Sequence, residues 1–434
     1  MRPSKYDYIV PTGEHTLFFN GVTEAFFNVP SERADTYETI INNPDDNRES
    51  FGAFIDRMLA QGFVVEDSID ELDRIKQKFE ALTRPWEYYL MVLPTYQCNL
   101  RCWYCTQNHA ELWMSDETLG RIKKMIANKL SDDEITHFRL SWFGGEPLLA
   151  YDKVLELTIF ARDYCKEHGK TFSCGITSNA TLLTPERIEA LREAGVSGYQ
   201  ITIDGDRETH DSIKVLANRS AYDKTLANVD LIARHTQCTL RFNYTHENLK
   251  PESIINDLKE KLSEESLKKL RFFIYKVWQE NKEDVDQREV DKLFKLGCEV
   301  GMHSGYSRFG LCYADQKHFD CVWPDGHVGK CDNQPPETTP GNIDDEGNVE
   351  WGDYEDRLRL NPFDNSQSEC PDCPYLPVCW GPCVAKRENM LSHNLKTVCQ
   401  FADRKIEMIS GLINIRKTIM QVIPLTKMEL ILLK

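Results

Sequence analysis

The chain has 434 residues, a hydrophobic share of 41%, a charged share of 28% and a formal net charge of −17 at pH 7. These shares are typical of a folded, soluble protein, and the length suggests two or three domains. The negative charge argues against a nucleic-acid partner, because phosphate binding needs a basic surface. No apolar run reaches the roughly 18 to 20 residues that span a bilayer, and the N-terminus lacks a signal-peptide pattern, so we expect a cytoplasmic protein without a membrane partner.

Residues 1–86 are expected to form a separate N-terminal module. Short apolar runs broken by turn residues predict hairpin strands over residues 6–10, 16–19 and 25–29. Helical patterns and a short strand follow over residues 32–41, 51–61 and 63–66. This order of small strands and helices suggests a winged-helix-like module.

Residues 87–305 alternate strand and helix patterns. The predicted strands cover residues 89–93, 137–142, 173–176, 198–203, 239–243 and 271–277. The predicted helices between them include residues 116–130, 153–167, 184–194 and 222–235. Repeated strand–helix units predict an α/β fold with a parallel sheet, and six units favour a partial (β/α)6 barrel of the TIM type over a complete eight-stranded one.

Residues 306–405 lose this periodicity and become rich in Cys, Pro, Gly and Asp. So little regular structure cannot bury much apolar surface, so a metal or covalent cross-link is expected to hold this domain together. Residues 406–434 are apolar with scattered charges and are expected to form a C-terminal helix.

Fifteen cysteines in a chain expected in a reducing compartment indicate metal or redox chemistry, because disulfides are rare there. The first group is Cys98, Cys102 and Cys105, which directly follow the first strand of the middle region. Three thiolates can each bind one iron of a cubane cluster and leave the fourth iron open. A structural zinc site would need a fourth ligand, for which His109 is only a weak candidate.

This Cys-x3-Cys-x2-Cys loop, with Tyr104 as the aromatic residue before its last cysteine, resembles the signature of the radical S-adenosylmethionine (SAM) superfamily. The resemblance implies a 4Fe-4S cluster whose open iron binds SAM. One electron, from a donor such as flavodoxin or ferredoxin, would then cleave SAM to methionine and a 5′-deoxyadenosyl radical. That radical would abstract a hydrogen atom from the substrate.

Three further segments follow successive strands. Gly144-Gly145-Glu146-Pro147 is similar to the family's GGEP element, in which glycines permit close approach and Glu146 could pair with the SAM ammonium. Ser178 and Asn179 resemble the next cofactor-contacting segment, although either residue singly could equally cap a helix. Asp204 ends the fourth strand at the expected mouth of the barrel.

The second cysteine group resembles the SPASM extension of this superfamily. The resemblance implies two auxiliary 4Fe-4S clusters, three clusters in all, with one bound by Cys312, Cys321, Cys331 and Cys383 and the other by Cys370, Cys373, Cys379 and Cys399. A zinc site formed by Cys370, Cys373, Cys379 and Cys383 is the competing interpretation.

Proteins with this extension resemble one another in acting on peptides or proteins. The favoured function is therefore oxidative modification of a ribosomally made peptide, such as a thioether or cross-link. The N-terminal module would bind the leader of the precursor as an added strand, or else cap the barrel. The alternative is an anaerobic sulfatase-maturating enzyme that forms formylglycine with Asp332 as base, because Asp332 directly follows Cys331. A non-enzymatic iron–sulfur electron carrier is a third possibility.

Overall fold

The structure is a computed structural model. It describes residues 1–11, 13–216, 220–277, 279–280, 286–306, 311–333, 341–351, 363 and 370–381. Cys383, Cys399 and the helix expected over residues 406–434 lie outside the described residues. None of the described helices is both long and apolar enough to cross a membrane.

The chain divides into two compact units. The first unit comprises Met1–Thr83, Ser307–Cys312 and Leu358–Lys434, and the second comprises Arg84–Tyr306 and Tyr313–Arg357. The cysteine-rich part of the chain is therefore divided between them, with Cys321 and Cys331 in the second unit and Cys370, Cys373 and Cys379 in the first.

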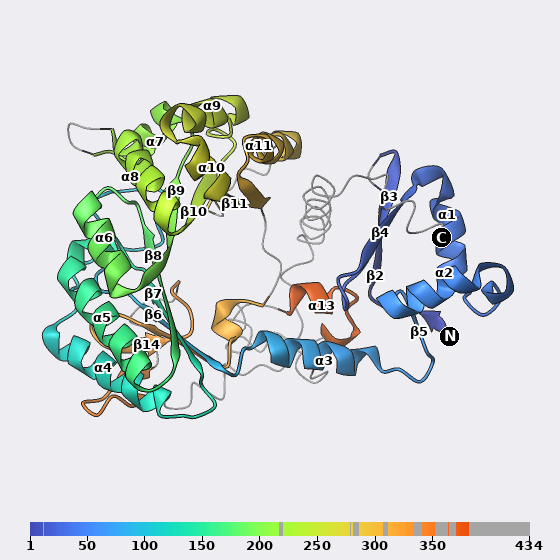
Figure 1. The fold of residues 1–434 in the computed structure, drawn as a ribbon, viewed down its shortest axis with the longest axis horizontal. Coiled ribbons are helices and arrows are strands. Elements are labelled where there is room, and N and C mark those ends of the chain that lie inside the picture. The colour runs from blue at the N-terminus through green and yellow to red at the C-terminus, as the bar shows by residue number, and fades with distance from the viewer. Residues whose placement is uncertain are drawn as a thin grey trace. The chain divides into compact units, whose positions relative to one another are not determined.

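The second unit is built on a parallel sheet. Its six consecutive strands are β6 (Glu87–Val92), β7 (His137–Trp142), β8 (Thr171–Ser178), β9 (Val196–Ile203), β10 (Gln237–Tyr244) and β11 (Arg271–Lys276). The helices between them are α4 (Asp116–Leu130), α5 (Tyr151–Glu167), α6 (Pro185–Ala194), α7 (Arg207–Ile213), α8 (Ala221–His235), α9 (Pro251–Lys261) and α10 (Glu264–Lys269) (Figure 1). The expected partial barrel is confirmed.

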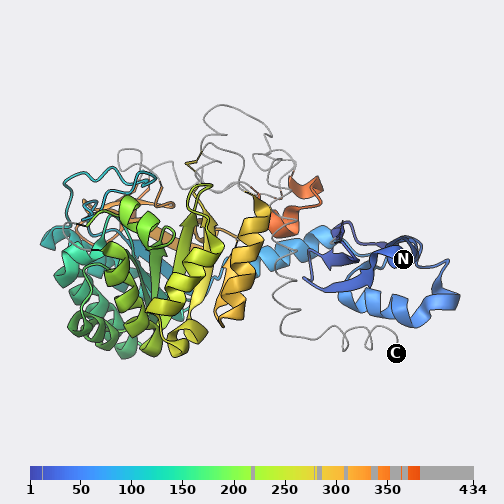
Figure 2. The ribbon, with the colours of Figure 1, turned by 90° about the horizontal axis from the view of Figure 1, so that it is seen from above.

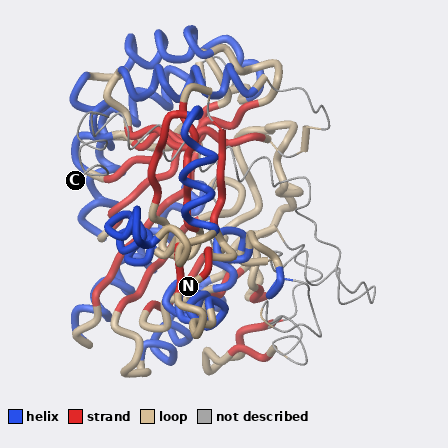
Figure 3. Tube along the Cα trace, turned by 90° about the vertical axis from the view of Figure 1, so that its right-hand side faces the viewer, coloured by secondary structure: helices blue, strands red, loops and turns tan. Residues whose placement is uncertain are grey.

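The helices lie along one side of the strands (Figures 2 and 3). Side chains alternate across a strand, so each strand presents one set of residues to the helices and the other set to the inner face. Leu140, Trp142 and Ile201 are fully buried in the core against the helices, whereas their neighbours Arg139 and Gln200 are half-buried. The inner face of the sheet therefore carries polar side chains such as these two.

The sheet continues past the six predicted strands. At one edge β12 (His303–Tyr306), after α11 (Gln287–Glu299), pairs in parallel with β11. At the other edge β13 (His318–Val322) pairs in parallel with β6, and β14 (His327–Gly329), β15 (Gly341–Ile343) and β16 (Val349–Glu350) add antiparallel strands. The sequence predicted little regular structure in the part of the chain that forms β13 to β16. These strands have only two to five residues each, which is too short for the alternation of polar and apolar residues to be recognised.

The first unit contains the N-terminal module. Its antiparallel sheet is formed by β2 (Asp7–Pro11), β3 (His15–Asn20) and β4 (Phe26–Pro30), each within one residue of its predicted range. A short pair, β1 (Arg2–Pro3) and β5 (Val64–Val65), and the helices α1 (Ala34–Asn42), α2 (Arg48–Gln61) and α3 (Glu71–Leu82) complete it. One face of the sheet packs on α1 and α2, where Phe18 and Phe27 of the strands meet Met58 of α2. The sequence pattern had not indicated α3.

Candidate cluster and cofactor site

The cysteine loop leaves β6 at its carboxyl end, where the sites of parallel barrels lie. Cys98 and Cys102 are partly buried and Cys105 is exposed. The Leu100 N–H donates to Cys98 Sγ at 3.4 Å, which stabilises negative charge on that sulfur. Burial raises the pKa of Cys102 to about 11, and the charges of Asp204, Cys105 and Cys98 raise it further against the opposing effect of Lys214. Cys102 therefore lies close enough to Cys98 and Cys105 for their charges to raise its pKa.

Asn179 lies beside the first of these cysteines. Its Nδ2 is 3.8 Å from Cys98 Sγ and donates to Asn99 Oδ1 at 3.0 Å. Asn99 in turn donates to Thr181 Oγ1 at 2.8 Å, and the Thr181 N–H donates to Asn179 Oδ1 at 2.9 Å. This closed set of hydrogen bonds fixes the cysteine loop against the end of β8.

Glu146 is 1% exposed, and its carboxylate accepts three hydrogen bonds. Oε1 accepts from Ser178 Oγ at 2.9 Å and from the Leu148 N–H at 3.1 Å, and Oε2 accepts from the Asn179 N–H at 2.9 Å. Burial raises the pKa of Glu146 to about 7, although these donors oppose the shift. The sequence suggested that Glu146 pairs with the SAM ammonium. In the structure its carboxylate links the segment after β7 to the end of β8, because it accepts hydrogen bonds from Ser178 and Asn179.

The two glycines allow the cysteine loop to approach this segment. A Cβ on Gly145 would lie 2.2 Å from the Gln97 carbonyl oxygen, and one on Gly144, whose φ is 116°, would lie 2.6 Å from the Thr95 carbonyl oxygen. The Gly145 and Glu146 N–H groups donate to these same carbonyls at 3.0 and 2.8 Å. Only glycine leaves room for this contact. The two glycines therefore allow the backbone at the start of the cysteine loop to pack directly against them.

Tyr104 is anchored to the end of β9. Its hydroxyl donates to Asp204 Oδ1 at 2.6 Å, and Asn243 Nδ2 donates to the same hydroxyl at 3.2 Å. Asp204 is completely buried, and its second oxygen is 3.3 Å from Lys214 Nζ, which is also buried. A buried carboxylate needs a counter-charge of this kind. The hydrogen bond from Tyr104 to Asp204 thus connects the cysteine loop to the end of β9. The ion pair with Lys214 supplies the counter-charge for the Asp204 carboxylate.

Lys214 and His210 belong to this site but carry no signal in the sequence. Lys214 lies in an ordinary mixed-charge segment, yet its ammonium donates to the Thr202 carbonyl at 2.8 Å and to Thr202 Oγ1 at 2.6 Å. The Asp204 N–H donates to His210 Nδ1 at 3.2 Å. Gln279 was also missed, and its side chain donates to the Tyr104 carbonyl at 2.6 Å. Only their long-range contacts reveal these residues.

His210 makes the stability of this unit depend on pH. Burial, helped by the charge of Lys214, lowers the pKa of His210 to about 3 from its usual 6.5. Below pH 6.5 the imidazole of His210 therefore binds a proton in the unfolded chain but stays neutral in the folded protein. The free energy of unfolding consequently falls as the pH falls from about 6.5 towards 3. We expect His210→Gln, whose amide oxygen can still accept from Asp204, to reduce this slope by up to about 1.4 kcal/mol per pH unit. Urea unfolding between pH 4 and 8 measures it, and equal slopes would contradict the assignment.

Asp332 follows β14 near the inner face of the sheet. Its carboxylate accepts a short hydrogen bond from the Tyr313 hydroxyl. Burial raises the pKa of Asp332, against the opposing charge of Arg241 on β10. Burial raises the pKa of Tyr89, which lies on the inner face of β6, and the charge of Asp332 raises it further. Asp332 therefore lies near the polar inner surface.

Two cysteines of the second group share one hairpin of the second unit. Cys321 on β13 is buried and pairs in register with Gly329 on β14, two residues before Cys331. Burial raises the pKa of Cys321 well above its ordinary value, and Asp332 and Cys331 raise it further. Among the described parts of the chain, no three His, Cys, Asp or Glu side chains surround a single-ion site.

The fold and the loop define a class of protein: a partial barrel whose first strand is followed at its carboxyl end by a loop with three cysteines. Residues 92–258, which contain Cys98, Cys102 and Cys105, match the model of the Radical SAM superfamily. This part of the chain is therefore a radical SAM domain, and members of that superfamily are enzymes that use a 4Fe-4S cluster and SAM. The family expected from the cysteine loop is therefore confirmed.

Two curated relatives and one solved structure illustrate what this chain is similar to. AdoMet-dependent heme synthase of Methanosarcina barkeri (strain Fusaro / DSM 804) is 30% identical over 148 residues, which are 32% of this chain and 36% of the relative. Fe-coproporphyrin III synthase of the same organism is 27% identical over 180 residues, 41% of this chain and 42% of the relative. The chain thus spans less than half the length of these relatives. Native anSMEcpe with bound AdoMet and Cp18Cys peptide has a TM-score of 0.54 at 18% identity, covering 77% of this chain and 99% of that one, and shows the shared fold.

Proposed function

We propose that this chain is a radical SAM maturase that installs an oxidative modification, such as a thioether or cross-link, in a ribosomally made peptide. The observation that carries the proposal is the convergence of four separate segments on one end of the sheet. The cysteine loop packs on Gly145, hydrogen-bonds to Asn179 and is anchored through Tyr104 to Asp204. Such fixed geometry is what a site for a reactive intermediate needs.

The three thiols of the loop fit a 4Fe-4S cluster with one open iron, because one loop supplies three neighbouring ligands and leaves the fourth iron without one. When bound, the cluster and SAM supply a 5′-deoxyadenosyl radical that removes a hydrogen atom from the substrate. The chain's own residues fix the loop, and the half-buried polar side chains of the inner face, such as Arg139 and Gln200, would contact the peptide. Asp332, whose pKa is raised by burial, would accept a proton from the oxidised substrate.

The second group of cysteines would bind two auxiliary 4Fe-4S clusters that receive electrons from the substrate. Cys312, Cys321, Cys331 and Cys383 would hold one, and Cys370, Cys373, Cys379 and Cys399 the other. The juxtaposition of Cys321 and Cys331 on one hairpin supports the first set. Flavodoxin or ferredoxin would deliver the electron for SAM cleavage, and such clusters suit a reducing cytoplasm.

The N-terminal module would bind the leader of the precursor peptide. Within the described residues, its three-stranded sheet has β2 and β4 at its edges, each paired on one side only. An extended peptide can pair with such an edge through main-chain hydrogen bonds. A second function, formation of formylglycine in a sulfatase, is favoured by Asp332 beside Cys331.

The test compares two peptides with the reconstituted, reduced protein and SAM under anaerobic conditions. One is a leader-bearing precursor encoded beside the gene, and the other is a sulfatase-derived peptide with its active-site Cys or Ser. Loss of two hydrogens from the precursor, together with 5′-deoxyadenosine, would support the proposal. An aldehyde in the sulfatase peptide, captured by a hydrazine, would replace it with the second function. Cleavage of SAM with both peptides unchanged would contradict both.

A further inference from the structure

The second face of the N-terminal sheet is covered by the cysteine segment, Cys370–Gly381, within the first unit. Tyr8, Leu17 and Phe19 on this face pack with Tyr375 and Val378. The rings of Tyr8 and Tyr375 stack with centroids 5.4 Å apart, and the Tyr8 hydroxyl donates to the Pro374 carbonyl at 2.6 Å. This face of the sheet is therefore covered by a distant part of the same chain.

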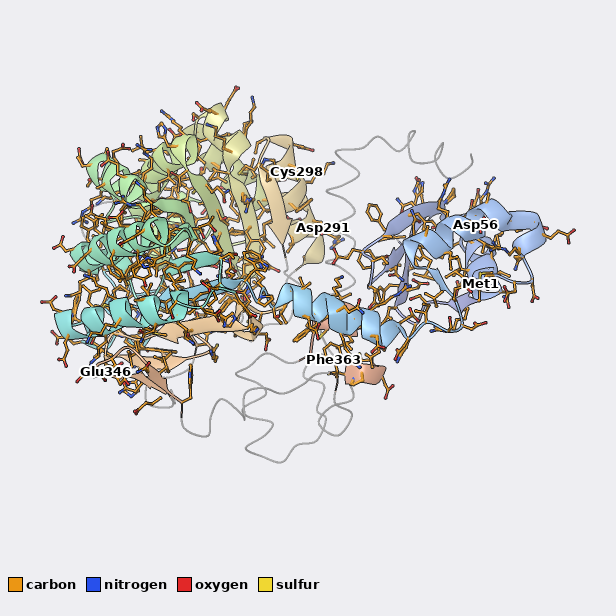
Figure 4. The ribbon with its side chains drawn as sticks, turned by 60° about the horizontal axis from the view of Figure 1, so that its bottom comes forward. Met1, Asp56, Asp291, Cys298, Glu346 and Phe363 are labelled. Atoms are coloured by element: carbon orange, nitrogen blue, oxygen red, sulfur yellow. The ribbon has the colours of Figure 1, made fainter. Side chains whose placement is uncertain are left out.

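Helix α3 supports the same segment from a second side. Phe79 lies 5.8 Å from Trp380 and 5.3 Å from Phe363, measured between ring centroids, and Figure 4 shows Phe363 beside this helix. Leu376 and Trp380 are 1% and 5% exposed, and they cluster with Tyr6 and Ile75 of the module. Cys370 packs against the same cluster.

The cysteine segment cannot hold this shape by itself. Its regular structure is one 3-10 turn, Cys370–Asp372, and one four-residue helix, Leu376–Cys379. Helices this short are unstable in water, because the conformational entropy lost in forming the first turn exceeds the stabilisation from its few hydrogen bonds. Most of the described apolar residues that cluster with the segment belong to the module, and Leu311 and Phe363 join them. The salt bridge of Lys5 to Asp372, at 3.8 Å between largely exposed groups, adds little.

We propose that the N-terminal module is the scaffold that positions Cys370, Cys373 and Cys379 for metal binding. This role goes beyond leader binding and beyond a cap on the barrel, and its metal-binding part rests on the proposed function. Tyr8 and Phe79 act as positioning residues, because they fix the backbone that carries the three thiols. Truncation of the module would therefore damage the cysteine segment and could not isolate leader binding.

The test compares Phe79→Ala with Phe51→Ala in the full-length protein. Both changes remove one phenylalanine ring from a module helix, but Phe51 is 42% exposed on α2, whereas Phe79 contacts Trp380. In metal-free protein, the amides of Cys379 and Trp380 donate to carbonyls within the segment at 2.8 and 2.9 Å. Phe79→Ala should speed their hydrogen exchange at least about tenfold, as expected from partial loss of a core ring, and Phe51→Ala should leave it unchanged.

The second readout uses anaerobically reconstituted protein and alkylation mapped by mass spectrometry. Phe79→Ala should expose Cys370, Cys373 and Cys379 to alkylation, while Cys98, Cys102 and Cys105 of the same molecules stay protected. If Phe79→Ala prevents folding of α3, Tyr8→Phe replaces it. This change removes only the hydroxyl that donates to the Pro374 carbonyl, and it should give a smaller change in the same direction. Identical behaviour of the contact variants and Phe51→Ala in both readouts would overturn the scaffold. Exchange protection in the wild type without alkylation protection would retain the scaffold and remove the metal site.

Discussion

Replacing Cys98, Cys102 and Cys105 together by Ala should abolish formation of 5′-deoxyadenosine from SAM. The three thiols are the loop's only thiolate donors, and without them no open iron remains to bind the cofactor. If the chain holds three 4Fe-4S clusters, iron should fall from about twelve to about eight atoms per chain. Anaerobic reconstitution, an iron assay and chromatography of the nucleoside products measure both quantities.

The control is Cys298→Ala, which removes a half-buried thiol on α11 (Figure 4). This variant should keep the wild-type iron content and rate, because Cys298 lies outside both cysteine groups. Cofactor cleavage by the triple variant would show that the loop does not hold the catalytic cluster. A loss of iron that goes well beyond four atoms would instead show that the auxiliary clusters depend on this loop.

Gly145→Ala should lower the rate of SAM cleavage by about 100-fold or more. The new methyl group would lie 2.2 Å from the Gln97 carbonyl oxygen, and this neighbour is backbone, which cannot rotate away. The cysteine loop must then shift, and a displacement of about 1 Å at a reacting site can cost about 100-fold. Single-turnover measurements of 5′-deoxyadenosine formation, with iron content in parallel, give the effect.

Gly120→Ala is the matched control, because a Cβ at Gly120 on α4 would meet nothing within 4 Å. Alanine in place of glycine in a helix interior should stabilise the protein by about 0.5 to 1 kcal/mol and leave cleavage unchanged. Wild-type iron content and rate in Gly145→Ala would mean that the close packing of the two segments is unimportant for the cluster.

The sequence by itself determined the family and the barrel. Cys98, Cys102 and Cys105 lie within eight residues, so their spacing alone brings three ligands together. The strands of the barrel were readable because polar and apolar residues alternate along them, as at Arg139, Leu140 and Ser141. Both patterns lie within short stretches of sequence, so they can be recognised without knowledge of the fold.

Tertiary structure alone decided what the other residues of the site do. Tyr104 and Asp204 are 100 residues apart, and their hydrogen bond depends on the adjacency of the cysteine loop and the end of β9. The sequence suggested an ammonium partner for Glu146, which stays a prediction, and only the structure shows that its buried carboxylate accepts three hydrogen bonds from the chain. Tyr8 meets Pro374 across 366 residues. Contacts of this kind are set by which surfaces are buried together, and burial is a property of the whole fold that no short stretch of sequence contains.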